Sequence, residues 1–121
     1  MALNIVAEPL SDYRRWVAGQ QGPGAPPADS VTKRGQEVFL TSPCAMCHAI
    51  GGTMAGSHIG PDLTHLASRS TIAAGTLPNT RGNLAGWILD SQRIKPGNKM
   101  PPNMLEPKDL DALLTYLQSL K

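Results

Sequence analysis

The sequence has few large side chains with which to build an apolar core. Its 121 residues include one Phe, two Tyr and two Trp, so that aromatic residues make up 4% of the chain. A single domain of this length hides only part of its surface, and its core is marginal even with an ordinary share of aromatics. The shortage indicates that a large apolar group other than a side chain completes the interior.

Long apolar runs and strong charge are missing as well. No stretch reaches the roughly 18 apolar residues of a membrane span. The formal net charge is +2, from 11 basic and 9 acidic residues, and no basic run is interleaved with aromatics, which argues against nucleic-acid binding. The N-terminal residues lack the basic head and long apolar run of a secretory signal. We therefore expect a fragment of a longer exported chain, or a chain whose signal has been removed.

The first 28 residues differ from the rest in pattern. Residues 3–8 alternate apolar and polar side chains as a short strand does, and residues 9–20 have the spacing of a short helix. The apolar stripe of that helix consists of Tyr13, Trp16 and Val17. Residues 22–28 are rich in Gly and Pro, which is typical of an extended, poorly packed linker. The main domain is expected to span residues 29–121, with residues 1–21 as a separate remnant.

The main domain is expected to be all-α, because apolar residues recur at helical spacing and no run alternates convincingly as a strand. Asp29 or Ser30 can cap a helix that ends near Thr41, and a short helix follows Pro61. A third helix begins after Asn79 or Thr80 and ends before Pro96, and a fourth begins at Pro107. The residues expected to face the core are Val31, Gly35, Val38, Phe39, Leu63, Leu66, Ala67, Leu84, Trp87, Ile88, Leu110, Leu113, Leu114, Leu117 and Leu120.

The segment Cys44-Ala-Met-Cys47-His48 carries the chemistry. Cys-x-x-Cys-His is the pattern of c-type haem attachment, because two thiols one turn apart can each form a thioether to a vinyl group on the haem edge. His48 then lies under the ring and can bind the iron. A dithiol redox site or a zinc site completed by His58 and His65 are the alternatives. No βαβ pattern supports the first and no further cysteine supports the second, so the motif favours haem.

A six-coordinate haem iron needs a second axial ligand, for which the methionines are the main candidates. Met100 lies in a proline-stiffened loop at residues 95–107, which can hold a thioether on iron; its alternative role is to fill a gap in the core. Met104 is the second choice. Met46 lies between the two cysteines, and Met54 lies in a Gly-rich loop, so neither is expected to reach the iron.

Four further residues are candidates for contact with the cofactor. The carbonyl of Pro61 can accept a hydrogen bond from the ring N–H of His48, and Leu63 is the apolar residue of the same segment. Arg69 and Trp87 can donate to a haem propionate. The alternatives are a plain turn at Pro61, a solvated Arg69 and a Trp87 that only packs.

Two surface features are weaker candidates. A basic rim near the haem edge can steer an acidic partner, although a solvated face is the favoured interpretation for any single side chain. Its residues are Lys33, Arg93, Lys95 and Lys99. Met54 and His58 in the Gly51–Gly60 loop can bind a metal, but an exposed loop is the favoured interpretation, and His65 is expected on the surface of its helix.

Taken in order, the cysteine motif, the Gly-Pro-Asp-Leu segment, the Met-Pro loop and a Leu-rich terminal helix resemble class I cytochromes c over residues 30–121. A closer resemblance is to the cytochrome c domain fused to the C-terminus of bacterial cytochrome c oxidase subunit II. It is carried by residues 60–69, 74–80, 87–88 and 95–101. Residues 3–21 resemble the tail of the dicopper cupredoxin domain that precedes it.

The resemblance implies a class I cytochrome c fold with helices packed around one covalently bound haem c. It implies that Gly35 and Phe39 cross against Tyr116 and Leu117. The implied function is transfer of single electrons from an upstream cytochrome or quinol-oxidising complex to the dicopper centre of the oxidase, without catalysis by the domain itself. The implied partners are the cupredoxin domain and the other oxidase subunits, with membrane contact only through the missing remainder of the chain.

Two alternatives remain beside the oxidase role. A free-standing periplasmic carrier of another respiratory chain is one, although residues 3–28 favour the oxidase because a free carrier does not need them. A haem enzyme or gas sensor with a vacant site is the other, and the proline-rich Met100 loop argues against it. Because bacteria attach haem c outside the cytoplasm, the expected location is the periplasm or the outer face of the cytoplasmic membrane.

Overall fold

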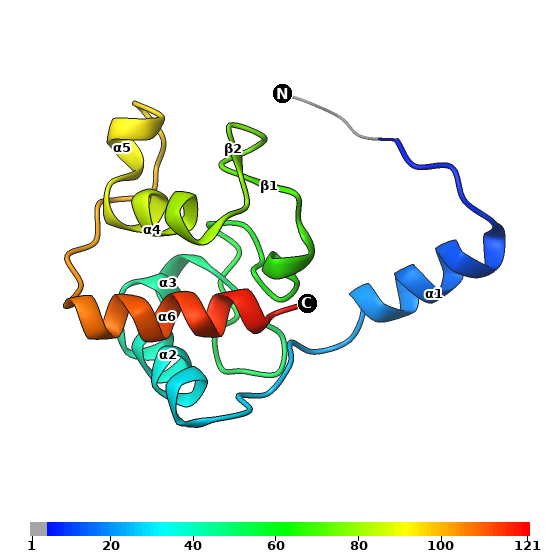
Figure 1. Ribbon diagram of the computed structural model, residues 1–121, viewed down its shortest axis with the longest axis horizontal. Helices are drawn as coiled ribbons and strands as arrows, with labels where there is room; N and C mark the ends of the chain where they lie inside the picture. Colours follow the sequence, from blue (N-terminus) through cyan, green and yellow to red (C-terminus); the bar gives the residue numbers. More distant parts are fainter. Residues whose placement is uncertain (1–4) are drawn as a thin grey trace.

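The computed structural model describes residues 5–121, whose main domain is built from short helices joined by long loops (Figure 1). The helices are α1 (Leu10–Gln20), α2 (Ser30–Thr41), α3 (Cys44–Cys47), α4 (Arg81–Leu89), α5 (Ser91–Ile94) and α6 (Pro107–Ser119), with a 3₁₀ turn η1 (Leu66–Ser68). The strands β1 (Thr71–Ile72) and β2 (Leu77–Pro78) pair antiparallel. The expected all-α class is confirmed, with this small hairpin and an isolated bridge between Ala49 and Gly56 as its β additions within the described residues.

Helix α2 begins where the sequence predicts. The Asp29 side chain accepts a hydrogen bond from the Thr32 backbone N–H at 2.7 Å, and the Thr32 hydroxyl pairs in return with the backbone N–H of Asp29 at 3.1 Å. This capping box satisfies donors that the first helical turn leaves free. The hydrogen bond from the Thr32 backbone also lowers the pKa of Asp29. Thr32 is buried, whereas Val31, expected on the inner face, is 44% exposed.

Helices α2 and α6 cross in close contact and form the frame of the domain (Figure 1). A Cβ atom on Gly35 would lie 2.1 Å from the carbonyl oxygen of Ala112 and 2.6 Å from Cβ of Tyr116. Phe39 and Tyr116 are buried beside this crossing, and burial raises the pKa of Tyr116. The crossing implied by the resemblance is confirmed, and it is possible because Gly35 has no side chain.

The core consists of the apolar faces of α2, α4 and α6 together with residues from the loops between them. Most of the residues expected to face inward do so, while Leu63, Ala67, Trp87 and Leu110 are half-buried. The fully buried large side chains are Tyr116, Phe39, Ile50, Leu113 and Leu120. Apolar burial of this kind contributes roughly 1.5–3 kcal/mol per large side chain, so the α2–α6 contact supplies much of the fold's stability.

The third predicted helix is divided in the structure. Thr80 caps α4 by accepting from the backbone N–H of Asn83 at 3.3 Å, as expected. Asp90 then leaves the helical conformation and caps α5 through a 3.1 Å bond from the backbone N–H of Arg93. The prediction of a single helix up to Pro96 was therefore wrong at Asp90, where the capping hydrogen bond of the side chain competes with continuation of the helix.

The segment before residue 29 is partly as predicted. Helix α1 is present, but its apolar stripe is uncovered: Tyr13 is 51% and Trp16 57% exposed, and α1 has no buried residue. The expected strand at residues 3–8 is wrong for residues 5–8, which are irregular, and residues 3 and 4 lie outside the described residues. Figure 1 shows α1 set apart from the helical body.

Residues 22–28 have no regular structure, as a linker would, but they are not free of contacts. The backbone N–H of Gly24 donates to the carbonyl of Gly51 at 2.9 Å. A Cβ on Gly24 would lie 3.1 Å from the Leu120 side chain. The expectation of a poorly packed segment is therefore wrong at Gly24, which lies against the domain.

The described residues include no helix long and apolar enough to cross a bilayer.

The crossing at Gly35 predicts the effect of the smallest possible side chain. We expect Gly35→Ala to lower the free energy of unfolding by about 1–3 kcal/mol, because the added methyl group meets backbone and Cβ atoms that cannot move aside. Gly82→Ala is the matched control, since nothing lies within 4 Å of a Cβ at that helical position. Denaturant unfolding measures both variants, and an equal effect of the two substitutions would contradict the role of the crossing.

Candidate functional site

The two cysteines lie at the first and last positions of the single-turn helix α3. Ser42 and Pro43 end α2 and set the start of this turn, and the Ser42 hydroxyl donates to Sγ of Cys44 at 3.2 Å. Both thiols are free and half-buried. Residues three apart in a helix share a face, so both thiols lie on the same face of α3.

His48 follows α3 in an extended conformation, with φ −110° and ψ 144°. Its Nδ1 lies 2.7 Å from the carbonyl oxygen of Pro61, which is the hydrogen bond that the sequence predicted. A carbonyl oxygen can only accept, so Nδ1 carries the proton and the lone pair of Nε2 is left for a metal ion. Such a bond fixes the orientation of a ligating imidazole and raises its basicity.

Gly60 provides the space that the His48 ring occupies. A Cβ on Gly60 would lie 2.6 Å from Cε1 and 2.8 Å from Nδ1 of His48. Its backbone N–H donates to the carbonyl of Cys47 at 2.6 Å, which holds the glycine against the ring. The ring is therefore confined between this backbone contact and its bond to Pro61.

Two further hydrogen bonds tie the loop after Gly60 to the segment after His48. The backbone N–H of Leu63 donates to the carbonyl of Ala49 at 2.8 Å. The buried Thr64 hydroxyl accepts from the backbone N–H of Gly51 at 2.8 Å. Together with the Gly60 bond they form a ladder that fixes the height of the Pro61 carbonyl relative to the His48 ring.

Asp62 holds this loop from its outer side. Its carboxylate accepts hydrogen bonds from both the hydroxyl and the backbone N–H of Thr64. Partial burial alone would raise the pKa of Asp62, but the Thr64 hydrogen bonds and the positive charges of Arg69 and His58 outweigh it, so that its pKa is lowered. Asp62 is therefore ionised at neutral pH and stabilises the turn that carries Pro61.

Met100 differs from the other methionines in the described part of the chain. Its side chain is half-buried and packs against the core, whereas Met46, Met54 and Met104 are 71%, 89% and 101% exposed. The structure therefore favours Met100 over Met104 as a candidate ligand. Its assignment as an iron ligand stays a prediction.

Ten apolar residues of the main domain are only half-buried. They pack on the core but keep part of their surface uncovered, and they are Leu40, Cys44, Ala45, Leu63, Leu77, Ala85, Trp87, Met100, Leu105 and Leu110. Two thiols, an imidazole with a free Nε2 and a thioether are suitable donors for a haem, and half-buried apolar residues are suitable neighbours for its faces. The residues present therefore fit a covalently bound haem.

Over residues 5–121, no hydrogen bond links the side chains of Arg69 and Trp87. The Arg69 guanidinium donates to the carbonyl of Asp62 and Arg69 is exposed, while Trp87 of α4 is half-buried and packs against the core. Their role at the propionates stays a prediction. In the basic rim, Lys95 donates to the carbonyl of Ala73 at 3.1 Å, and Lys33, Arg93 and Lys99 are exposed.

The histidines outside the motif do not form a metal site. Over residues 5–121 no group of three or more His, Cys, Asp or Glu side chains gathers as a metal centre would require, so the zinc alternative has no ligand set there. His65 was expected on the surface, but it is half-buried. Its Nδ1 lies 2.9 Å from the carbonyl oxygen of Lys121, and its Nε2 is buried without a partner among the described residues.

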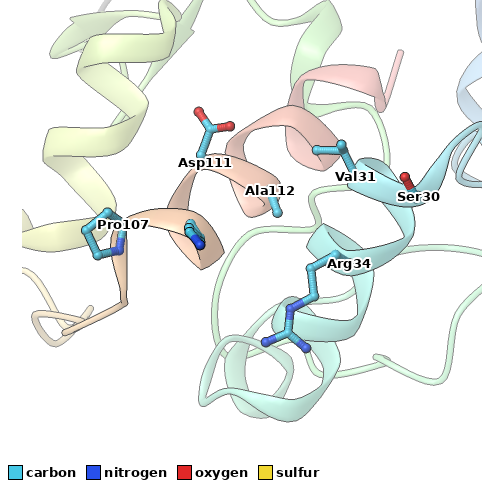
Figure 2. Close-up of a pocket in the computed structure, with 7 residues that line it drawn as sticks. Ser30, Val31, Arg34, Pro107, Asp111 and Ala112 are labelled. Atoms are coloured by element: carbon cyan, nitrogen blue, oxygen red, sulfur yellow. The ribbon is translucent and has the colours of Figure 1, made fainter.

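An open surface hollow lies at the N-terminal ends of α2 and α6. Its lining residues are Ser30, Val31, Arg34, Pro107, Lys108, Asp111 and Ala112, and all but Lys108 are labelled in Figure 2. None of the predicted site residues lines it. Arg34 makes a two-pronged bond to Asp109, at 2.9 and 3.1 Å, which raises the pKa of Arg34 and links the two helices at this hollow.

The sequence interpretation missed three residues that position the site. Gly60 was named as part of a motif, without its contact to the His48 ring. Thr64 carried a usable signal, since Asp-x-Thr favours a local turn with side-chain hydrogen bonds. Ser91 carried none: it is fully buried, and its hydroxyl donates to the carbonyl of Met100 at 2.6 Å across nine residues.

Comparison with known proteins places these features in a family. A family model described as cytochrome c matches residues 32–121. Cytochrome c oxidase subunit 2 of Alkalihalophilus pseudofirmus is 40% identical over the whole of this chain and 35% of its own length. The same subunit of Bacillus sp. strain PS3 is 35% identical over 93% of this chain and 33% of its own length. The same subunit of Bacillus subtilis is 27% identical over the whole of this chain and 35% of its own length. The chain thus spans about a third of the length of these relatives.

The contact at Gly60 predicts a second destabilising substitution. We expect Gly60→Ala to lower the free energy of unfolding by about 1–3 kcal/mol, because the methyl group displaces the His48 ring from the Pro61 carbonyl. Gly56→Ala is the control in the same loop, because nothing lies within 4 Å of a Cβ there. Thermal unfolding compares the two, and an unchanged Tm for Gly60→Ala would contradict the confinement of the ring.

The lowered pKa of Asp62 predicts a pH-dependent contribution to stability. A carboxyl whose folded pKa lies below its unfolded value of 3.8 stabilises the fold above that value, and the contribution is lost as the pH falls through the folded pKa. We expect Asp62→Asn to be less stable than the original chain near pH 7, with the difference shrinking below about pH 4. Urea unfolding across this range measures the effect, and a difference that grows on acidification would contradict it.

Proposed function

The chain belongs to the cytochrome c family, and on that basis we propose that it transfers single electrons through one haem attached at Cys44 and Cys47. The observation that carries the proposal is the His48–Pro61 hydrogen bond of 2.7 Å directly after the cysteine turn. It fixes the tautomer in which Nε2 of His48 is free, directly after the two cysteines in sequence, so that His48 could bind the iron of a haem attached there. A bound haem supplies the one-electron iron couple.

The roles of the protein groups follow from their places. Cys44 and Cys47 fasten the cofactor covalently, His48 binds the iron, and Met100 is the proposed second ligand. Leu63 and the indole of Trp87 would help to exclude water from a bound haem, and Arg69 and Trp87 are the proposed donors to propionates. A methionine opposite a histidine raises the reduction potential, which suits a carrier in a respiratory chain.

Electron transfer without substrate chemistry is favoured by the same arrangement. With an imidazole and a thioether both bound, the iron has no position open for oxygen, peroxide or a gas. Among the methionines of residues 5–121, Met46, Met54 and Met104 are exposed and Met100 is half-buried, which supports Met100 as the ligand that would close that position. We therefore propose a carrier domain rather than a haem enzyme or sensor.

The relatives suggest where the domain works. They are described as cytochrome c oxidase subunit 2, and this chain accounts for about a third of each. We propose that the domain takes electrons from an upstream cytochrome or quinol-oxidising complex and passes them to the dicopper centre of the same oxidase. Residues 1–21 would then be the tail of the cupredoxin domain, residues 22–28 the linker and residues 29–121 the cytochrome domain. The proposed location is the periplasm or the outer face of the bacterial membrane.

The optical spectrum of the matured protein tests the ligand assignment. We expect Met100→Ala to abolish the weak red-region band of methionine-bound ferric haem and to allow rapid binding of carbon monoxide to the reduced protein. Met104→Ala is the matched control and keeps the band, because its side chain is fully exposed. Loss of the band in Met104→Ala, with Met100→Ala unchanged, would reverse the assignment.

The oxidase role is tested separately in the full-length subunit. After rapid reduction of the haem, the electron is expected to arrive at the dicopper centre of the same molecule at a rate independent of protein concentration. A rate proportional to the concentration of a second protein would instead favour a free-standing carrier.

A further inference from the structure

The loop that carries Met100 has no secondary structure, yet both backbone groups of Met100 are hydrogen-bonded. Its N–H donates to the side-chain oxygen of Asn98 at 2.8 Å. Its carbonyl accepts from the hydroxyl of Ser91 at 2.6 Å and from the side-chain amide of Gln92 at 2.9 Å. Side chains thus provide every hydrogen bond that a helix or sheet would otherwise supply at this residue.

Ser91 is placed at the start of α5 for this contact. It is 0% exposed, which is unusual for a serine, and its single proton is used in the short bond to Met100 rather than in the longer approach of 3.2 Å to Asn98. A buried hydroxyl is costly unless it is bonded. The buried position of Ser91 therefore depends on its bond to the Met100 carbonyl, and the same bond fixes the position of that carbonyl.

Gln92 ties the loop at three points. Its amide nitrogen donates to the carbonyls of Asn98, at 2.7 Å, and Met100, at 2.9 Å, and its oxygen accepts from the backbone N–H of Gly97 at 3.2 Å. One side chain therefore uses its two donors and its acceptor on residues 97–100. This makes the turn before Met100 a single hydrogen-bonded unit with α5.

The loop is held on the other side of Met100 as well. Pro101 and Pro102 have no N–H to donate. Asn103 follows them, and its backbone and side-chain N–H groups donate to the carbonyls of Leu89 and Ile88, both at 3.2 Å. These carbonyls belong to the last turn of α4, which leaves them without helical partners. Met100 therefore lies between two anchored ends.

We propose that Ser91 and Gln92 are positioning residues for the sixth iron ligand: their side chains fix the Met100 backbone so that its thioether stays on the iron. The inference rests on the proposed role of Met100. Both residues act through the Met100 backbone, because their side chains donate to its carbonyl. Without them the loop can move Met100 away while the haem stays attached through Cys44, Cys47 and His48.

Added imidazole measures this equilibrium in the oxidised holoprotein, because imidazole binds only where Met100 has left the iron, so its apparent affinity is proportional to that fraction. We expect Gln92→Leu to raise the apparent affinity for imidazole about tenfold and Ser91→Ala to raise it several-fold, both with a weaker red-region band. Gln36→Leu is the matched control, because Gln36 donates to the Tyr116 hydroxyl at 3.2 Å in the α2–α6 contact. It is expected to lower Tm without changing the affinity for imidazole.

The outcomes separate this inference from the proposed function. Unchanged imidazole affinity in Ser91→Ala and Gln92→Leu, with the band lost in Met100→Ala, would overturn the positioning role alone. An equal rise in Gln36→Leu would overturn it too, since general loosening of the fold would then explain the effect. A red-region band that survives in Met100→Ala would remove both the ligand assignment and this inference. If Gln92→Leu fails to fold, the apparent imidazole affinity of Ser91→Ala alone decides whether the positioning role stands.

Discussion

The hydrogen bond from Nδ1 of His48 to the carbonyl of Pro61 is the interaction on which the rest of the site depends. It sets the tautomer of the imidazole, leaves the lone pair of Nε2 free and ties the cysteine turn to the loop after Gly60. The hydrogen bonds between residues 47–51 and 60–64 maintain the length of the His48–Pro61 bond, and the ionised Asp62 stabilises the loop that carries Pro61. A small apolar core alone could not hold a ring this firmly.

The segments that carry the two proposed iron ligands are held in the same way. Neither the His48 segment nor the Met100 loop belongs to a helix or sheet. Polar side chains from nearby residues fix each of them: Thr64 holds the first, and Ser91 and Gln92 hold the second. Helices α2 and α6, in contact at Gly35, supply the frame to which these loops are attached. Hydrogen bonds thus do in the loops what apolar packing does in the helices.

The elements predicted best from sequence are those governed by local chemistry. The cap at Asp29, the cap at Thr80 and the Leu-rich stripe of α6 follow from residue type and spacing, and the structure has them. The errors came where distant contacts decide: Val31 is exposed because Thr32 takes the inner position, and the β1–β2 hairpin places Ala73 and Ala74 at φ +54° and +58°, which alanine does not signal. The serine and glutamine that hold Met100 could not be foreseen, because their partners are five to nine residues away in a loop.

The ring protons of His48 test the account most directly. In the reduced, diamagnetic holoprotein, nitrogen-resolved proton NMR of the imidazole should show a proton on Nδ1 that exchanges slowly with solvent, with Nε2 bound to iron and bearing none. We also expect faster exchange of that proton when Gly60→Ala displaces the ring. A proton found on Nε2, or an Nδ1 proton that exchanges as freely as in an exposed histidine, would contradict the central claim.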